Sequence, residues 1–238
     1  MKLSIIIPVF NEINTIETIV DKINDLQSLN KEIIIVDDFS NDGTTSLLKN
    51  VVYKKVHIIV HHEKNLGKGA AIKSAKSLVT GDIVIIQDAD LEYDPKDYYN
   101  LIKPIQDKQY KVVYGSRVLG RNRYLQDNFT SLYRIFFNHF LTFLSNLLNK
   151  QNLTDAHTCY KVFSRNVFDS INLEENDFSF CPEVTTKLAL KNIKIKEVPI
   201  NYYGRDYKEG KKIKAFDGLK AIFVLLKYRF TKKNEISF

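Results

Sequence analysis

Apolar and polar positions follow two alternating periods along the first half of the chain. Short apolar, β-branched runs such as Leu3–Val9 and Glu32–Asp37 have the composition of strands buried on both faces. Between them, Ile13–Leu29 carries apolar residues three and four positions apart, the period of an amphipathic helix. Further helices are predicted at Thr44–Lys54, Gly69–Val79 and Lys96–Gln106, and further strands at Val56–His61, Asp82–Gln87 and Lys111–Gly115. Strands that alternate with helices in this way predict an α/β fold, a mostly parallel sheet flanked by helices.

Two segments of the second half, Ser131–Asn149 and Phe216–Phe230, are helical in period and strongly apolar. The first is long enough to cross a bilayer, but it contains Arg134, Asn138, His139 and Asn146, whose burial in lipid would be costly. We therefore expect two amphipathic helices and no transmembrane segment. Core packing explains either helix alone, whereas the two together favour contact with a membrane surface.

Composition and charge narrow the class of protein. Hydrophobic residues make up 44% of the 238 residues, which indicates a folded globular chain rather than a disordered one. Cys159 and Cys181 are the only cysteines, which excludes a disulfide framework and a four-cysteine zinc site and favours a reducing cytosol.

The formal net charge of +7 is unevenly placed along the chain. Lys191–Lys233 holds 13 Lys plus Arg against 4 Asp plus Glu, so this segment alone carries +9 and the remainder −2. A basic segment of this kind suits a solvated face, an anionic membrane or a nucleic acid. Because the aromatic residues are not interleaved with Lys and Arg in a recognisable binding module, we expect no nucleic-acid partner.

The candidate chemistry is concentrated where the strand Asp82–Gln87 ends. Asp88, Asp90, Glu92 and Asp94 follow it in alternate positions, and the carboxyl end of a strand is where open α/β sheets bind ligands. Carboxylates this close repel each other unless a cation lies between them. Mg²⁺ or Mn²⁺ held by one or two carboxylates usually also holds substrate phosphates. The stretch therefore predicts a metal–diphosphate site.

The three preceding strands also end in polar loops, Pro8–Glu12, Asp37–Thr44 and His62–Gly69. Each loop alone has an ordinary explanation as a turn, a helix cap or a tight glycine turn. Four such loops in order at one edge of one sheet instead indicate a binding site.

Taken in order, these motifs resemble the family-two glycosyltransferases with the GT-A fold, and within them the dolichyl-phosphate mannose synthase-like branch. The resemblance is carried by IIIPVFNE, VDDFSNDGT, HHEKNLGKGAAIKSA, GDIVIIQDADLEYDP, VVYGSR, TDAHTCYKVFSR, FCPEVTTKLA and EVPINYYGRDYKEGKKI. It implies one GT-A domain with a Rossmann-like sheet over residues 1–214. A basic amphipathic helix over residues 215–238 would pack on the domain or on a membrane surface.

On the donor side, the resemblance implies a nucleotide sugar bound across the first half of the chain. The nucleoside pocket would be lined by Pro8, Phe10, Glu12, Asp37 and Asp38, with the two aspartates contacting base or ribose. Lys68 would approach the nucleotide. Asp88 and Asp90 would be the DxD pair that bridges a divalent metal, Mg²⁺ or Mn²⁺, to the diphosphate, and Glu92 a further metal contact. The alternative for the aspartate pair is helix capping.

On the acceptor side, the resemblance implies a polyprenyl phosphate. Its phosphate would be held by Arg117, Arg134, Arg205 and Lys211, and the planar fork of arginine suits phosphate oxygens. A phosphate is already anionic and needs no strong base, so positioning and charge stabilisation would carry most of the rate.

Two carboxylates near the presumed sugar pocket have more than one possible role. Asp155 would contact the sugar or, in an enzyme that acts on a hydroxyl, serve as the general base. Glu183 would either line the pocket, or hydrogen-bond backbone or pair with a lysine.

The sequence therefore predicts an inverting enzyme that moves a hexose from a nucleotide sugar of GDP-mannose or UDP-glucose type to a polyprenyl phosphate. We expect it in the cytoplasm, peripheral on the cytoplasmic face of a membrane. One alternative is a glycosyltransferase that acts on a sugar hydroxyl in glycan assembly, and another is a non-catalytic nucleotide-binding protein at a membrane surface. The sequence leaves the donor nucleotide, the lipid length and the oligomeric state open.

Overall fold

The computed structural model describes residues 1–119, 132–204 and 215–231. Its strands are β1 Leu3–Val9, β2 Lys31–Asp37, β3 Ile58–His61, β4 Ile83–Ile86, β5 Val112–Ser116, β6 Lys161–Ser164 and β7 Ile195–Pro199. Its helices are α1 Ile16–Asn24, α2 Thr44–Asn50, α3 Lys68–Lys76, α4 Tyr98–Gln106, α5 Leu132–Asn149, α6 Arg165–Ser170, α7 Phe180–Leu190 and α8 Ala215–Thr231. Short 3₁₀ turns, Val52–Lys55 and Pro95–Asp97, follow α2 and precede α4.

Within the described residues the strands form one seven-stranded sheet in the order β3-β2-β1-β4-β6-β5-β7. The first four strands are parallel, as the alternation of strands and helices predicts. β6 runs antiparallel to both of its neighbours, β4 and β5, and β7 is again parallel to β5. The sheet is thus mostly parallel, with one reversed strand that the hydrophobic pattern did not predict.

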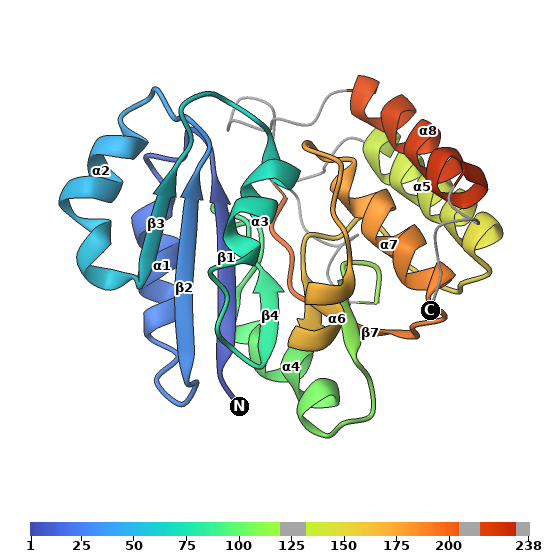
Figure 1. The fold of residues 1–238 in the computed structure, drawn as a ribbon, viewed down its shortest axis with the longest axis horizontal. Helices are drawn as coiled ribbons and strands as arrows, with labels where there is room; N and C mark the ends of the chain where they lie inside the picture. The colour runs from blue at the N-terminus through green and yellow to red at the C-terminus, as the bar shows by residue number, and fades with distance from the viewer. Residues whose placement is uncertain (120–131, 205–214, 232–238) are drawn as a thin grey trace.

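The helices cover both faces of this sheet (Figure 1). α3 and α6 lie on one face, where the Lys76 Nζ donates to the Asp169 carbonyl at 3.0 Å. α1 and α4 lie on the other face, where the Ser28 and Tyr99 hydroxyls are 2.6 Å apart. α5, α7 and α8 pack on one another beside the far end of the sheet.

The centre of the core is the isoleucine-rich part of β1, β2 and β4. In β1, Ile5, Ile6 and Ile7 are fully buried and pair in register with three isoleucines of β2. Ile5 and Ile6 also pair with β4. A strand that is buried on both faces needs apolar residues at every position, which accounts for the continuous apolar runs in the sequence.

The two amphipathic helices predicted in the second half are present as α5 and α8, and they lie side by side. Gly218 of α8 faces the Phe137 ring so closely that a Cβ at this position would lie 2.0 Å from a ring carbon. The glycine thus lets the two helices approach. Among the described residues, none of the helices combines the length and the hydropathy needed to cross a bilayer.

A buried polar cluster closes the amino-terminal edge of the sheet, opposite the polar loops. The Glu32 carboxylate accepts hydrogen bonds from the Lys2 Nζ at 2.5 Å, from the Thr80 backbone N–H at 2.7 Å and from the Ser4 hydroxyl. These groups join the start of β2 to the start of β1 and to the turn before β4. Burial alone would raise the pKa of Glu32, but the donors outweigh it and lower the pKa to about 2.

We expect Glu32→Gln to destabilise the protein by about 3 kcal/mol at neutral pH, because the donors around position 32 lose their charged acceptor. A lowered pKa stabilises the fold fully above the ordinary value of 4.5 and less as the pH falls toward 2. Urea unfolding of wild type and variant over a pH series measures this, and the two curves should converge at low pH. A difference that does not depend on pH would contradict the electrostatic origin.

Candidate active site

The loops that follow β1, β2, β3 and β4 meet at the carboxyl edge of the sheet (Figure 1). The loops after β1 and β2 are tied together by the Asn11 Oδ1, which accepts from the Asn41 N–H at 2.8 Å. The Asn11 N–H in turn donates to the Ser40 hydroxyl at 2.9 Å. The parallel pairing of the strands therefore brings together loops that are far apart in the sequence.

Asp37 and Asp38 are both buried and build the loops around them. Asp37 accepts from the Thr45 hydroxyl at 2.5 Å and lies 3.1 Å from the His61 Nδ1. Burial would raise the pKa of Asp37, but its hydrogen bonds outweigh it and lower the pKa. Asp38 accepts from the Gly67 N–H at 2.7 Å, which ties the end of β2 to the glycine loop. The predicted contacts of these aspartates to base or ribose stay a prediction.

The β1 loop places the three other residues predicted for the nucleoside pocket at the same edge. Pro8 lies within β1 and Phe10 follows the strand directly. The Glu12 carboxylate is buried and accepts from the Thr15 hydroxyl at 2.7 Å. The Glu12 N–H donates to the Thr44 hydroxyl at the start of α2, at 2.9 Å. Glu12 therefore joins the starts of α1 and α2 at the edge where the pocket is predicted.

Gly67 and Gly69 let the glycine loop pack directly against a second loop, residues 174–178. Gly67 has a backbone φ of +98°, which favours glycine. A Cβ on Gly67 would lie 2.5 Å from the Asn176 carbonyl oxygen, and one on Gly69 would lie 2.4 Å from the Glu175 carbonyl oxygen. The Ala70 N–H donates to the Asn176 carbonyl at 2.9 Å. The glycines therefore serve close backbone approach as well as a turn.

Lys68 lies between these two glycines and forms an ion pair with the Asp88 Oδ1. Its Nζ is also 3.4 Å from the Cys159 Sγ and 5.9 Å from the centre of the Phe178 ring. Burial opposes the charge of the lysine, but Asp88 outweighs it and raises the pKa of Lys68 well above its ordinary value. Asp88 therefore already binds a positive charge.

Asp90 and Glu92 follow Asp88 on the same loop. The Asp90 Oδ1 accepts from the Glu92 N–H at 3.1 Å. The Glu92 carboxylate is buried and accepts from the Tyr202 hydroxyl at 2.9 Å. Within the described chain, no three His, Cys, Asp or Glu side chains form a group that could hold a metal ion. The predicted metal contact of Glu92 stays a prediction.

The buried side-chain amide of Gln87 holds the backbone of Asp88. The Gln87 Oε1 accepts from the hydroxyls of Tyr98 and Tyr160, both at 2.7 Å, and its Nε2 donates to the Asp88 carbonyl at 2.8 Å. Gln87, Tyr98 and Tyr160 have no exposed surface. Because every polar group in this network has a partner, it sets the direction of the chain as it leaves β4.

Arg117 and Asp155 form a buried ion pair. The Arg117 Nε lies 2.6 Å from the Asp155 Oδ2 and its Nη2 lies 2.8 Å from the Oδ1, which is a bidentate contact. Asn138 of α5 donates to the Asp155 Oδ1 at 3.3 Å. The Arg117 guanidinium lies 5.1 Å from the centre of the Tyr202 ring. Asp155 has no exposed surface, so its carboxylate is sealed inside the protein.

Two residues that the sequence analysis did not single out hold the loop around Asp155. The Nζ of fully buried Lys161 donates to the carbonyls of Ala156 at 3.1 Å and Thr158 at 2.5 Å. Glu197 of β7 accepts from the Asp155 N–H at 2.9 Å. Both residues lie within quoted motifs, but their backbone partners are visible only in three dimensions.

The same loop presents polar atoms that have no hydrogen-bond partner in the described part of the chain, the His157 Nε2 and the Thr158 Oγ1. Burial and the nearby Lys161 charge lower the pKa of His157 to about 3. Its imidazole is therefore neutral at physiological pH and can donate or accept a hydrogen bond.

Four predicted residues remain: Glu183, which the structure describes, and Arg134, Arg205 and Lys211, whose side chains it does not describe. Glu183 is fully buried and accepts from the Glu174 N–H at 2.7 Å and the Lys187 Nζ at 2.6 Å. This contact matches the alternative in which Glu183 binds backbone and pairs with a lysine. Arg134 lies on α5 without a described side chain, and Arg205 and Lys211 lie outside the described residues.

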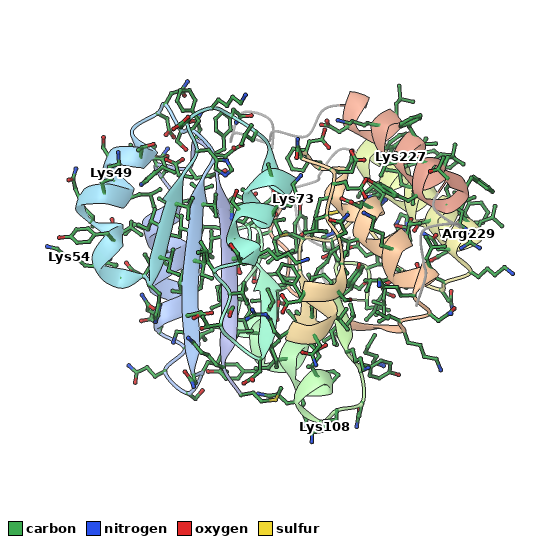
Figure 2. All side chains as sticks on the ribbon, viewed as in Figure 1. Lys49, Lys54, Lys73, Lys108, Lys227 and Arg229 are labelled. Carbon is green, nitrogen blue, oxygen red and sulfur yellow. The ribbon has the colours of Figure 1, made fainter. Side chains whose placement is uncertain are left out.

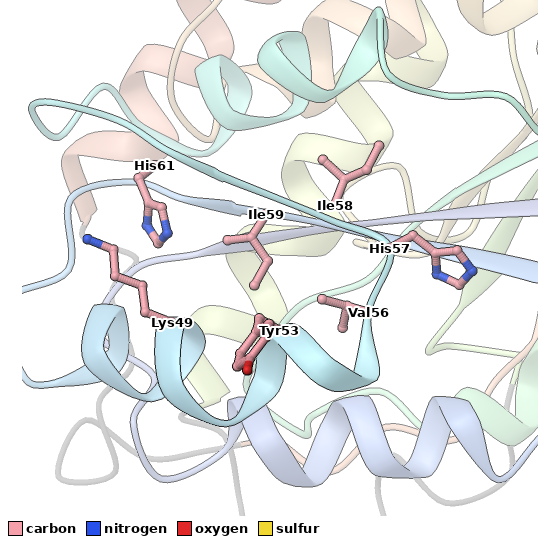
Figure 3. A pocket seen from close by; sticks show the side chains of 7 residues that line it. All are labelled: Lys49, Tyr53, Val56, His57, Ile58, Ile59 and His61. Atoms are coloured by element: carbon pink, nitrogen blue, oxygen red, sulfur yellow. The ribbon is translucent and has the colours of Figure 1, made fainter.

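A separate hollow of about 370 Å³ lies beside the edge strand β3 (Figure 3). Its lining comes from α2, the turn after it and β3, and consists of Lys49, Tyr53, Val56, His57, Ile58, Ile59 and His61. It contains none of the predicted site residues. His61 is its link to the site, because the same imidazole contacts Asp37.

The carboxylates at this edge have the chemistry that the predicted divalent cation, bound with a diphosphate, requires. Asp88 carries a cationic side chain, Lys68, at the carboxyl edge of β4, and Asp90 lies two residues further on. One or two carboxylates completed by phosphate oxygens are typical of Mg²⁺ sites. Asp88 and Asp90 are therefore the residues that would hold the metal.

Comparisons with known proteins give the relatives of this chain. The family model described as Glycosyl transferase family 2 matches residues 4–171. UDP-N-acetylglucosamine--dolichyl-phosphate N-acetylglucosaminyltransferase of Methanococcus voltae is 28% identical, over 96% of each chain. Dolichol-phosphate mannosyltransferase of Pyrococcus furiosus is 27% identical, over 96% of this chain and 64% of that protein.

A solved structure shares the fold. Glucosyl-3-phosphoglycerate synthase from Mycobacterium tuberculosis, in complex with Mn²⁺, UDP and phosphoglyceric acid, superposes with a TM-score of 0.68 at 20% identity. The match covers 96% of this chain and 78% of that one. The same enzyme is also known with Mg²⁺ and UDP. The GT-A fold predicted from the sequence is thereby confirmed.

We expect Asp155→Asn to destabilise the protein by about 3–5 kcal/mol, because it leaves the Arg117 charge buried without its partner. Urea unfolding at neutral pH measures the change. Asp21→Asn is the matched control, since it breaks an exposed pair with Lys55 and should have little effect. The double variant Arg117→Met, Asp155→Leu should recover much of the loss. Equal stability of Asp155→Asn and the control would show that the buried charge is not the cause.

Proposed function

The chain belongs to Glycosyl transferase family 2, and from that premise we propose that it transfers a hexose from a nucleotide sugar to a polyprenyl phosphate, with inversion at the anomeric carbon. That it is a glycosyltransferase follows from the family and from the named activities of its relatives. The donor sugar and the lipid acceptor are the proposed part. The observation that carries the proposal is the pair of carboxylates at the edge of β4, one of which already holds a cationic side chain.

The donor half of the proposal rests on the loops at the carboxyl edge. Asp88 and Asp90 would hold a divalent cation, which would neutralise the charge on the departing nucleoside diphosphate. The structural relative is known with Mn²⁺ or Mg²⁺ and with UDP, which supports a divalent ion here. Lys68, whose ammonium contacts Asp88, is proposed to bind a phosphate of the donor.

The proposed lipid-phosphate acceptor is supported by two relatives and by the burial and ion pairing of Asp155. Both named relatives carry dolichyl or dolichol phosphate in their names and match 96% of this chain. An enzyme that acts on a sugar hydroxyl needs a general base. Asp155, the carboxylate considered for that role, is sealed inside the protein and bound to Arg117. A phosphate acceptor needs no such base, so this geometry favours it.

We propose that the protein's own residues position the two substrates and stabilise the charge that develops in the transition state. The Gln87 network holds the backbone of Asp88 at the end of β4, and Asp88 and Asp90 are proposed to face the donor. Asp155 holds the Arg117 guanidinium in one orientation, and Arg117 is proposed to donate its remaining N–H groups to the acceptor phosphate. Arg134, Arg205 and Lys211 are proposed to add further charge there. Such preorganised charge stabilises the transition state without reorganisation during the reaction.

The proposal is tested by incubating the enzyme with Mn²⁺, a polyprenyl phosphate and a panel of nucleotide sugars, and by counting sugar that extracts into organic solvent. We expect Asp88→Asn and Asp90→Asn each to lower this transfer by about a hundredfold or more, since each removes a metal-binding charge.

Asp94→Asn is the control on the same loop, because Asp94 caps the following turn at the Lys96 N–H and asparagine caps equally well. It should keep wild-type transfer. Sugar transferred to a soluble glycan, with none extracted as lipid for any donor, would instead support the hydroxyl-acceptor alternative. Nucleotide binding without any transfer would support the non-catalytic one.

We further propose that α5 and α8 together seat the enzyme on a lipid surface. Phe136, Phe143 and Leu147 of α5 and Leu219, Phe223 and Phe230 of α8 are each more than 60% exposed. The two helices lie side by side, and these side chains are proposed to form one apolar surface across both. Exposed apolar surface of this kind on amphipathic helices is typical of proteins that lie in a membrane interface.

Electrostatic attraction to an anionic membrane is proposed to contribute less than apolar contact at this surface. Figure 2 shows Lys227 and Arg229 on α8, but also Lys49 and Lys54 at the α2 end of the molecule. Lys220 and Lys227 form ion pairs with Asp177 and Glu175 of the loop 174–178. Two lysines of α8 are thus partly neutralised within the protein. Apolar insertion is therefore proposed as the main source of affinity.

We expect Phe143→Ser and Phe223→Ser each to weaken binding to vesicles by about tenfold or more, because each removes the burial of one aromatic ring. Co-sedimentation with phosphatidylglycerol vesicles measures this. Tyr53→Ser is the control, since Tyr53 is 52% exposed but lies on the α2 side of the molecule. Equal binding by all three variants would contradict this lipid-facing surface.

A further inference from the structure

Lys68 is held against the carboxylate of Asp88 in a partly enclosed position. It is the first residue of α3 and follows Gly67, whose positive φ turns the chain into the helix. The lysine side chain keeps 15% of its accessible surface and the aspartate 21%. The Phe178 ring and the Cys159 Sγ lie beside the Nζ, so the lysine has little access to water.

Each charge of this pair would be costly without the other. Asp90 lies two residues from Asp88, so the loop carries two carboxylates close together and needs a nearby positive charge. A lysine as enclosed as Lys68 is in turn poorly solvated and needs a nearby negative charge. The Lys68 ammonium thus lies on the carboxylate that the proposed donor site assigns to a metal.

We propose that Lys68 is the resident counter-ion of Asp88 in the donor-free enzyme, and that it releases Asp88 and moves to the donor's diphosphate when divalent cation and donor bind together. The inference rests on the proposed donor site. Ion partners are exchanged, and no covalent bond forms or breaks. Until the exchange, Lys68 acts as a positioning residue that holds Asp88 in place.

The exchange makes metal binding depend on the nucleotide. A divalent cation that arrives alone has to displace Lys68 from Asp88 and leaves the enclosed ammonium without a new partner. A nucleoside diphosphate supplies that partner, because its phosphate oxygens accept charge-assisted hydrogen bonds from the ammonium. The Lys68 side chain therefore opposes metal alone and favours metal with nucleotide. This coupling acts equally on both ligands, because linkage is reciprocal.

The test measures binding rather than turnover. Mn²⁺ affinity is determined by electron paramagnetic resonance for wild type, Lys68→Met and Lys64→Met, each alone and with UDP or GDP. Lys64 is exposed on the same loop, so Lys64→Met removes the same charge without touching Asp88. We expect Lys68→Met to bind Mn²⁺ alone about tenfold more tightly than wild type, and the Mn²⁺–nucleotide complex about tenfold more weakly. Lys64→Met should match wild type in both.

Two other results separate this inference from the proposed function. If wild type binds Mn²⁺ with nucleotide, but Lys68→Met keeps wild-type affinity for Mn²⁺ alone or for the complex, the exchange is overturned and the function stands. If wild type binds no Mn²⁺–nucleotide complex, the proposed donor site itself is overturned.

Crystals of the wild type give the same answer where the variants fail to fold. Two structures are compared, one of the protein alone and one with Mn²⁺ and the nucleoside diphosphate. The exchange predicts that the Lys68 Nζ contacts Asp88 in the first and a phosphate oxygen in the second. Lys68 on Asp88 in both structures overturns it.

Discussion

The parallel pairing of β1 with β2 and β4 is the constraint on which the site depends. Isoleucines at consecutive positions bury both faces of these strands, and the hydrogen-bond ladder then fixes where each strand ends. Val9 pairs with Asp37, and the Gln87 N–H donates to the Ile6 carbonyl. A slip by one residue would turn every side chain to the opposite face. Core packing alone therefore brings Asp37, Asp38 and Asp88 to the same edge, before any ligand is considered.

The residues that could be predicted from the sequence are those whose role follows from their own strand or helix. Periodicity located the first five strands and the long helices, and the loops between them gave the candidate carboxylates. β6 runs against its neighbours, and no local pattern indicates the direction of a strand. Lys161 and Glu197 hold the Asp155 loop through backbone groups of other segments. The choice between two roles for Glu183 likewise depended on the backbone of Glu174, nine residues earlier.

The loop 174–178 joins the glycine loop to α8. On one side the backbone of Glu175 and Asn176 lies against Gly67 and Gly69, so closely that neither glycine could carry a side chain without displacing the loop. On the other side the Tyr228 hydroxyl of α8 donates to the Glu175 carboxylate at 2.9 Å. A shift of α8 would therefore change the packing of the glycine loop. The helix proposed to touch lipid and the lysine proposed to touch the donor are thus joined by a short series of direct contacts.

Exposure distinguishes the ion pairs that build this protein from the one proposed to open. The carboxylates of Glu183 and Asp155 have no exposed surface, and that of Glu32 has 5%. Each of these pairs also holds backbone N–H groups of another segment, so opening one would break the local structure. Asp88 keeps 21% of its side-chain surface and lies at the edge where the four loops meet. Separation of Lys68 from Asp88 would leave the network of Gln87 beneath it intact. Among these four pairs, the one at this edge is therefore the one that a ligand can open at the lowest structural cost.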